Sequence, residues 1–461
     1  MLSLDAPEYT TRLSKPFSPL PLSLKPAQLH AAVPKHLFER STLKSSFYIL
    51  RHLAVGAALL WGVYRIDEAT EWVVRQALGG WQEKWTRVLV GWVLWSNYWF
   101  WQSMVMAGIW VLGHEAGHDA LSPSGSVNEI LGIVFHTFVL TPYHAWKATH
   151  RTHHKKTNHL GHDETHMPWY RSDFRLPPEQ EATKIDYKDM VEETPAFSLF
   201  RLVVRQFIGF QGYLLVNRKG NKKYPRWTSH YNPNAKLFKP ADHNGIIFSD
   251  ICILSMIALL TYWGNLRGGR EAWQVYWVPW FWMHNWIVTF TYLQHTDPTV
   301  PYYRDGQWTF LRGAMCTVDR PIFGWIGKVF FFSVAHDHVA HHIFASVPFY
   351  HLAEVTEHIK PILGDHYLYD PTPTFYALWR SFTQCQFVED HGDILIFKNQ
   401  AGEPTMQLED QHRNKLTQSE HGRKHVKEIS SATQRASNGH TSISKKPSKV
   451  GNGSAVSKKE L

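Results

Sequence analysis

Long apolar segments constrain this chain more than any other feature, because a helix needs about 20 mostly apolar residues to cross a bilayer. Four segments reach this length and composition or come close to it: residues 47–64, 88–112, 246–263 and 272–293. Trp and Tyr crowd these segments, as in the aromatic belts at the two surfaces of a membrane. The sequence therefore predicts an all-α membrane protein with about four transmembrane helices.

Two further apolar segments are weaker. Residues 127–143 are too short for a clean span, so we expect them to enter the membrane region and return. Residues 197–216 carry Arg201 and Arg205 among apolar side chains, which suits either a helix lying in the membrane interface or a buried amphipathic helix.

The number of spans predicts the topology. Two spans precede the first of three histidine clusters, and two more precede the last cluster, so all clusters and both termini are expected on one face. The long loop at residues 173–244 is rich in Lys and Arg, whereas the loop at 264–271 is short. The positive-inside bias therefore predicts that this face is cytosolic.

The two ends of the chain differ from its middle. We expect a polar, Pro-rich segment at residues 1–45, a membrane domain at 46–400 and a disordered cytosolic tail at 401–461, because the tail has too few apolar residues to form a core. The chain ends in Lys458-Lys459-Glu460-Leu461, which resembles a dilysine retrieval signal of the endoplasmic reticulum or is the chance end of a Lys-rich tail.

Charge and cysteine content exclude two classes of protein. The net charge of +9 comes from loops and the tail and not from one helix face, so we expect no nucleic-acid partner. The three cysteines, Cys252, Cys316 and Cys385, are far apart in sequence. A disulfide scaffold is not expected, and a reducing compartment fits.

Histidine is the residue that carries the predicted chemistry. His114 and His118 lie one helical turn apart at the end of the second span, so they share one face of a helix. A single HxxxH is weak evidence in a chain with 29 histidines. The pair His162 and His166 has the same spacing, and we assign it no role.

The pattern HxxHH occurs twice and is far more specific. Its imidazoles at i, i+3 and i+4 face one side of a helix. The two copies supply six predicted metal ligands: His150, His153, His154, His338, His341 and His342.

Eight imidazoles on one membrane face exceed the need of a single metal ion, because a catalytic zinc takes three protein ligands and a water. Two metal ions are therefore predicted. Imidazole binds zinc, copper, iron and nickel, so the ligands do not select the metal.

The residues from His114 to His118 also match HExxH, the zinc metalloprotease motif in which Glu is the general base. That alternative leaves six imidazoles without a role. Glu115 is then expected to accept a hydrogen bond from a ligand imidazole, and Asp119 and Asp337 are further candidates for this supporting role.

Several stretches resemble the microsomal oleate desaturase family over roughly residues 34–399. They are GHEAGH at 113–118, WKATHRTHH at 146–154, TYLQHT at 291–296, LRGA at 311–314, TVDR at 317–320, and HVAHH at 338–342 followed by IFASVP. The resemblance implies a four-span bundle with a cytosolic helical cap that holds a histidine-rich di-iron site beside an acyl tunnel. It also implies His295 as a ninth ligand, two iron ions, O2 as co-substrate, and conversion of oleoyl to linoleoyl (Δ12) chains in a lipid of the endoplasmic reticulum membrane.

The electrons for such a reaction are expected from an external donor, since the sequence has no dinucleotide-binding Gly-rich fingerprint and no haem-binding module. The resemblance implies cytochrome b5 and its NADH-dependent reductase as partners, and the basic loop suits an acidic partner.

Three departures from the family pattern flank the predicted ligands. Ala116 stands where the family commonly has Cys, Asp119 where it often has His or Gln, and His336-Asp337 where Asp-Thr is usual. Such changes accompany omega-3 desaturase, acetylenase, conjugase and hydroxylase activities in this family, so these outcomes stay open. The choice between a phospholipid and a thioester substrate, and the oligomeric state, also stay open.

Overall fold

The computed structural model describes residues 4–76 and 81–409, and its regular structure is almost entirely helical, which confirms the predicted fold class. The helices and strands are α1 (Pro7–Leu13), α2 (Pro26–Ala32), α3 (Thr42–Val63), α4 (Ile66–Gln76), α5 (Trp81–Gly117), α6 (Gly125–Phe138), α7 (Tyr143–Lys156), α8 (Lys184–Met190), α9 (Pro195–Val216), α10 (His243–Arg267), α11 (Gly269–Ala272), α12 (Val278–His295), β1 (Tyr302–Tyr303), α13 (Phe310–Ala314), α14 (Gly324–Phe330), α15 (His338–Ile343), α16 (Phe349–Leu363), α17 (Thr374–Gln384) and β2 (Ile394–Leu395). Short 3-10 turns lie at Lys35–Phe38, Arg171–Phe174, Pro240–Asp242 and Gly364–His366, and a π-helical turn at Trp273–Trp277.

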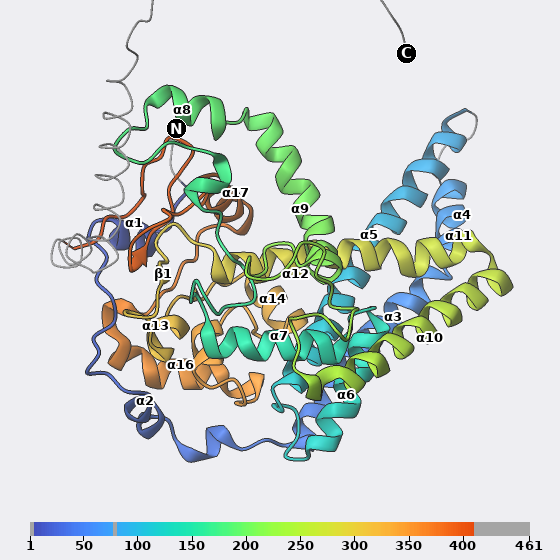
Figure 1. The fold of residues 1–461 in the computed structure, drawn as a ribbon. Helices are drawn as coiled ribbons and strands as arrows, with labels where there is room; N and C mark the ends of the chain where they lie inside the picture. Colours follow the sequence, from blue (N-terminus) through green and yellow to red (C-terminus); the bar gives the residue numbers. More distant parts are fainter. Residues whose placement is uncertain (1–3, 77–80, 410–461) are drawn as a thin grey trace, which may run out of the picture. The chain divides into compact units, whose positions relative to one another are not determined.

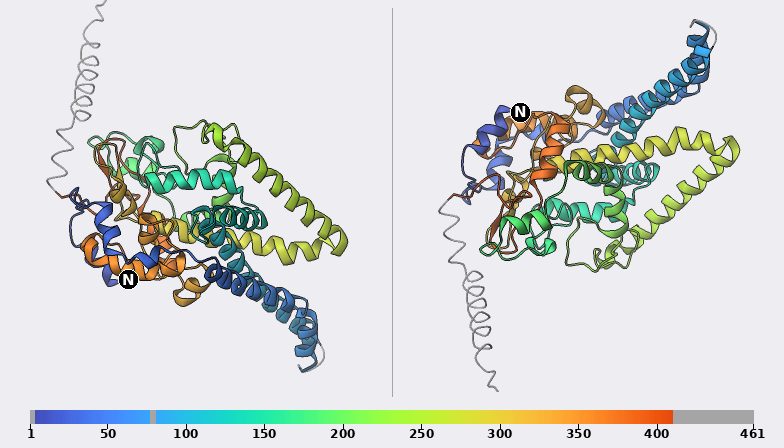
Figure 2. Two further views of the ribbon diagram at one scale, coloured as in Figure 1. Left: turned by 90° about the horizontal axis from the view of Figure 1, so that it is seen from below. Right: turned by 90° about the horizontal axis from the view of Figure 1, so that it is seen from above.

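Two pairs of long helices dominate the arrangement (Figure 1). Helix α3 packs along α5, and α5 also packs against α12 and α6. Helix α10 leads through α11 and the π-helical turn into α12. In both views of Figure 2 the α3–α5 pair and the α10–α12 pair project toward the same side, away from the short helices and loops that follow α12.

Within the described residues, three helices are long and apolar enough to cross a membrane by length and composition: Thr42–Val63, Pro195–Val216 and Pro240–Arg267. They expose large apolar side chains, including Phe47 (66% exposed), Phe200 (61%) and Leu254 (65%). Lipid chains remove the cost that such side chains would have in water. Helices α3 and α10 coincide with the first and third predicted spans, and the chain is a membrane protein.

The second and fourth predicted spans also form helices, within α5 and within the segment from α11 to α12. Neither belongs to the apolar set, because their many Trp and Tyr residues and the amides of Asn97, Gln102 and Asn285 lower the mean hydropathy. Helix α9, for which the sequence suggested either an interfacial or a buried amphipathic helix, is one of the three apolar helices found among the described residues. Helix α6 has 14 residues and is too short to cross.

Residues on both sides of the predicted domain limits pack into one unit that spans Met1–Glu409. Near the N-terminus, Tyr9, Leu29 and Leu37 are buried. Phe17 pairs with Leu408 through a backbone bridge, so residues near 400 also belong to this unit. The limits at 45 and 400 stay predictions, and the rest of the predicted tail, with its dilysine end, lies outside the described residues.

A small two-stranded sheet joins the loop after α12 to the segment at Ile394–Leu395. Strands β1 and β2 are antiparallel, with Tyr302 opposite Leu395 and Tyr303 opposite Ile394. Tyr302 and Tyr303 are buried and follow His295 by only a few residues. The sheet therefore anchors the loop that leaves the predicted metal site.

Candidate metal centre

The first histidine cluster lies at the C-terminal end of α5. The rings of His114 and His118 are 4.7 Å apart, as expected for one helical turn. Gly113 is required here because a Cβ atom at this position would lie 2.1 Å from Cδ2 of His136 on α6. The close approach of α5 and α6 fixes the end of α5 and the two histidines on it.

The second cluster occupies the last turns of α7. His153 and His154 are buried, and the ring of Trp146 stacks on His150 at 4.4 Å. This stacking and the apolar contacts of Trp146 hold the histidine face of α7 against α5.

The third cluster forms the short helix α15, and His338, His341 and His342 are all buried. The N-terminus of this helix is held by Asp319, whose carboxylate accepts a hydrogen bond from the Val339 backbone N–H at 2.7 Å. A helix of six residues is marginal on its own, so such tertiary contacts determine its position.

The three clusters converge into two groups. Ligand atoms of the first group lie within 4.8 Å of one another and belong to His114, His118, His150, His154 and His341. The second group consists of His153, His295 and His342, within the same limit. His338 adjoins it, with Nε2 at 3.0 Å from Nε2 of His295. The structure thus brings all nine predicted histidines together.

The nitrogen positions fit two metal ions. Pairs of Nε2 atoms lie 3.3 Å apart for His153 and His295, and 3.1 Å apart for His150 and His154. Imidazole nitrogens that bind one first-row ion stand about 3 Å apart. Several buried nitrogens have no hydrogen-bond partner, among them both of His341 and the Nε2 atoms of His118 and His342. Metal coordination satisfies such atoms, which would otherwise be costly to bury.

Burial also keeps the imidazoles of the first group neutral. Burial, with a smaller contribution from neighbouring imidazoles, lowers the pKa of His114 and His341 to about 3. Burial raises the pKa of the Glu115 carboxyl to about 7. At neutral pH the rings of His114 and His341 therefore each have a lone pair available for a cation.

Hydrogen bonds at Nδ1 orient several rings and leave Nε2 free. His114 donates to the Glu115 carboxylate at 3.0 Å, and His153 to Asp163 at 2.8 Å. His338 donates to the Val334 carbonyl at 3.0 Å. Such partners fix the tautomer and raise the basicity of a metal ligand.

The other two carboxylates suggested by the sequence are placed differently. Among the residues that the structure describes, neither Asp119 nor Asp337 is hydrogen-bonded to a histidine ring. Asp337 accepts from Thr356 at 3.3 Å, and Asp119 adopts a positive φ of 58° just beyond α5. No hydrogen bond among the described residues therefore supports a role for Asp119 or Asp337 in orienting a ligand imidazole.

A third group of possible ligands, His159, His162 and Asp305, lies nearer the surface. The Gly161 backbone N–H donates to Nδ1 of His159 at 3.1 Å. Nε2 of His159 therefore carries the proton and donates to Asp305 at 2.9 Å. This arrangement is a hydrogen bond between side chains and leaves no free lone pair on His159.

Comparison with known proteins identifies the family. A sequence model described as fatty acid desaturase matches residues 90–373. The chain is 39% identical over 376 residues to the Δ12 fatty acid desaturase of Mortierella alpina, covering 80% of this chain and 90% of that protein. The corresponding enzyme of Mortierella isabellina matches equally well. An oleate hydroxylase of Claviceps purpurea is 35% identical over 414 residues, or 83% and 82% of the two chains.

The chain belongs to the fatty acid desaturase family. It is an oxidoreductase that acts on fatty-acyl chains, and its histidine clusters are typical of the two-metal site of this family.

The position of Glu115 does not fit the metalloprotease alternative. Glu115, the residue that would act as general base in HExxH, is 1% exposed. Its carboxylate is bonded to His114 and lies 4.0 Å from Nδ1 of His341. It is therefore enclosed by imidazoles and has no open position beside a peptide substrate.

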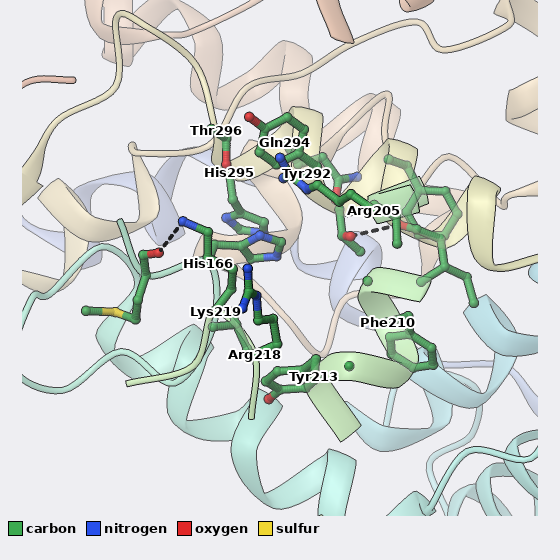
Figure 3. A pocket seen from close by; sticks show the side chains of 18 of the residues that line it. His166, Arg205, Phe210, Tyr213, Arg218, Lys219, Tyr292, Gln294, His295 and Thr296 are labelled. Atoms are coloured by element: carbon green, nitrogen blue, oxygen red, sulfur yellow. Dashed lines mark hydrogen bonds between the residues drawn. The ribbon is translucent and has the colours of Figure 1, made fainter. Parts of the chain in front are cut away.

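The desaturase has a cavity of about 470 Å³ beside the second histidine group (Figure 3). Its wall includes His153 and His295 from the metal site. Apolar and aromatic side chains make up much of the rest: Trp110, Trp146, Val204, Ile208, Phe210, Ile287, Val288, Phe290 and Phe382. A largely apolar cavity that reaches the metal site suits a fatty-acyl chain.

The sequence analysis missed two residues of this site. Asp163 is buried and orients His153, but it comes from a loop whose path the sequence does not reveal. His166 lines the cavity, and its ring stacks on His295 at 4.9 Å. The HxxxH spacing of His162 and His166 did not predict this role, because the two rings do not share a site. His162 faces Asp305 at the surface, whereas His166 faces the cavity.

Proposed function

We propose that this protein is an acyl-lipid desaturase that converts oleoyl to linoleoyl chains (Δ12) with two iron ions and O2. The observation that carries the proposal is the 39% identity to a Δ12 desaturase over 90% of that enzyme, in a chain whose nine predicted ligands converge. The nine histidines are the proposed iron ligands.

Each part of the chain has a defined task in this proposal. The oxygen chemistry is supplied by iron bound at the two histidine groups. Asp163 and Glu115 hold His153 and His114 in the tautomer that leaves Nε2 free. The cavity wall excludes water and presents one carbon pair of the acyl chain to the histidines, so its shape selects the position of attack.

The remaining predictions complete the proposal. We propose that the protein resides in the endoplasmic reticulum membrane with its termini and histidine clusters on the cytosolic side. Electrons would come from cytochrome b5 and its NADH-dependent reductase. Exposed basic residues between α7 and α10, such as Arg226, Lys236 and Lys239, provide the positive charge that such an acidic donor requires.

The test is to express the full chain in a cell that makes oleate but no polyunsaturated acids, and to identify the fatty acids by gas chromatography. A new 18:2 Δ9,12 acid with the wild type, absent with His153→Ala and present with the surface variant His162→Ala, supports the proposal. Metal analysis of the purified protein should give iron. Zinc in its place, with no new lipid, contradicts the proposal.

A second outcome has its own support. The chain is 35% identical to an oleate hydroxylase, and Ala116 and Asp119 depart from the usual pattern beside His118. A hydroxylated C18 acid in the same chromatogram would assign that activity in place of Δ12 desaturation.

A further inference from the structure

Three cationic side chains line the cavity without a carboxylate partner among the described residues. Arg205 comes from α9, and Arg218 and Lys219 follow the C-terminal end of that helix. Their neighbours are different: Arg201 is paired with Glu193, and Lys222 is paired with Asp173. Arg201 also lines the cavity, so three of the four Arg and Lys side chains in its wall have no carboxylate partner among the described residues.

Aromatic rings hold these cations but do not neutralise them. The guanidinium of Arg205 lies 3.2 Å from the centre of the Tyr292 ring. Arg218 and Lys219 lie over Trp169, at 5.4 and 4.4 Å. A cation–π contact orients a cation and leaves its charge available to an anion.

The charged form of Lys219 is electrostatically unfavourable in this arrangement. Its ammonium donates to the Met167 carbonyl at 3.3 Å. Burial lowers the pKa of Lys219 well below its ordinary value, and the charges of Arg205, Lys222 and Arg218 lower it further. Like charges gathered beside an apolar cavity are unfavourable unless a ligand brings the opposite charge.

We propose that Arg205, Arg218 and Lys219 bind the phosphate ester of the acyl substrate while its chain occupies the cavity. Figure 3 shows Arg218 and Lys219 gathered near His166, with Arg205 on α9 facing the same cavity. Guanidinium and ammonium groups bind phosphate oxygens through charge-assisted hydrogen bonds. This inference rests on the proposed function and adds the chemical class of the headgroup.

The surroundings of α9 fit a ligand of this kind. Helix α9 also exposes Phe197, Leu199 and Val203, which do not line the cavity, so lipid can lie against the same helix that carries Arg205. Two acyl substrates carry a phosphate ester: a phospholipid and a coenzyme A thioester. The chemistry recognised is the same, and the experiment separates the two sources.

The experiment measures binding of three radiolabelled ligands to the purified full chain in detergent: dioleoylphosphatidylcholine, oleoyl-coenzyme A and dioleoylglycerol. Dioleoylglycerol has the acyl chains without phosphate. The variants are the double substitution Arg205→Gln with Lys219→Gln, the single substitution Arg218→Gln, and the charge-conserving Lys219→Arg. Lys222→Gln is the matched control, because Lys222 lies in the same loop, is paired with Asp173 and does not line the cavity.

We expect the double variant to weaken binding of a phosphate-bearing ligand about tenfold or more. Binding of dioleoylglycerol should not change, and Lys219→Arg and Lys222→Gln should bind as the wild type does. Loss confined to phosphatidylcholine identifies a phospholipid substrate, and loss confined to oleoyl-coenzyme A identifies a thioester. Equal loss for all three ligands, or no loss for any, overturns the inference.

Binding without turnover keeps this test separate from the test of function. Unchanged dioleoylglycerol binding also shows that a variant has folded. If the wild type makes linoleate but the variants lose no affinity, the headgroup inference alone fails. If the wild type binds phosphate-bearing ligands through these residues but makes no new fatty acid, the proposed reaction fails and the binding site stands.

Discussion

Arg320 and Asp297 form an ion pair, 2.6 Å between Nη2 and Oδ2, in the buried interior two residues beyond His295. The same guanidinium donates through Nε to the Leu293 carbonyl at 2.9 Å and contacts Asp370 at 2.5 Å. Arg320 therefore holds the chain on both sides of His295. Since Asp319 also holds the start of α15, the segment Thr317–Arg320 joins the ninth histidine to the third cluster.

We predict that Arg320→Gln destabilises the fold by about 3–5 kcal/mol, because it removes one partner from a buried ion network. Arg320→Lys should recover little of the lost free energy of unfolding, since an ammonium cannot make the forked contacts of a guanidinium. Thermal unfolding followed by Trp fluorescence measures the effect. The control is Arg65→Gln, which breaks an exposed pair with Glu68 and should cost less than about 1 kcal/mol. Equal shifts for Arg320→Gln and Arg65→Gln would show that the buried network contributes little.

Asp163→Asn should weaken metal binding about 10- to 100-fold without unfolding the protein. The amide still occupies the space but no longer accepts the His153 Nδ1–H bond as a charged partner. Retention of the bound metal during dialysis against a competing chelator measures the change. Asp305→Asn is the control because Asp305 bonds His159 away from the metal groups. Identical retention in wild type and Asp163→Asn would remove Asp163 from the supporting set.

His341→Ala should reduce the metal content from two ions per chain toward one. His341 belongs to the first group, and neither of its ring nitrogens has a hydrogen-bond partner among the described residues. Elemental analysis of the purified chain gives the ratio, with His162→Ala expected to match the wild type. A His341→Ala protein that keeps two ions would show that the first group binds without it.

The sequence was sufficient for the parts of the site that repeat along a helix. The i, i+3, i+4 spacing of His150, His153 and His154 fixes a shared face in any helix, so their convergence was predictable. Asp163 and Arg320 were not, because each reaches its histidine segment through a loop or from a distant part of the chain. Asp337 was assigned a supporting role from its place beside His338, yet its carboxylate faces Thr356. Adjacency in sequence does not determine the direction of a side chain at a helix start.

Hydropathy likewise predicted some helices better than others. Helix α9 was ambiguous because Arg201 and Arg205 lie among apolar residues. In the structure both side chains line the cavity, and α9 also exposes apolar side chains such as Leu199 and Val203 that do not line it. The charges that obscured the hydropathy pattern therefore belong to the cavity wall.

The contact between α6 and α7 should lose stability in acid. Glu129 on α6 accepts from His144 Nε2 at 2.5 Å and from Lys147 at 2.8 Å, both on α7. The hydrogen bonds to His144 and Lys147 lower the pKa of Glu129 to about 2 against the opposing effect of burial. A carboxyl whose pKa is lower in the folded state stabilises the fold above its unfolded value of 4.5 and loses that contribution as the pH falls toward about 2.

Glu129→Gln lacks this contribution at every pH. We therefore expect the wild type to have the higher unfolding midpoint at pH 6, and the difference to shrink between pH 4.5 and pH 3. Thermal unfolding of both proteins across this range measures it, and Glu181→Gln, at an exposed position before α8, should show no such trend. A difference that is constant with pH would mean that Glu129 acts through packing and not through its charge. Because α7 carries the second histidine cluster, metal retention in Glu129→Gln should fall in parallel with the loss of this contact.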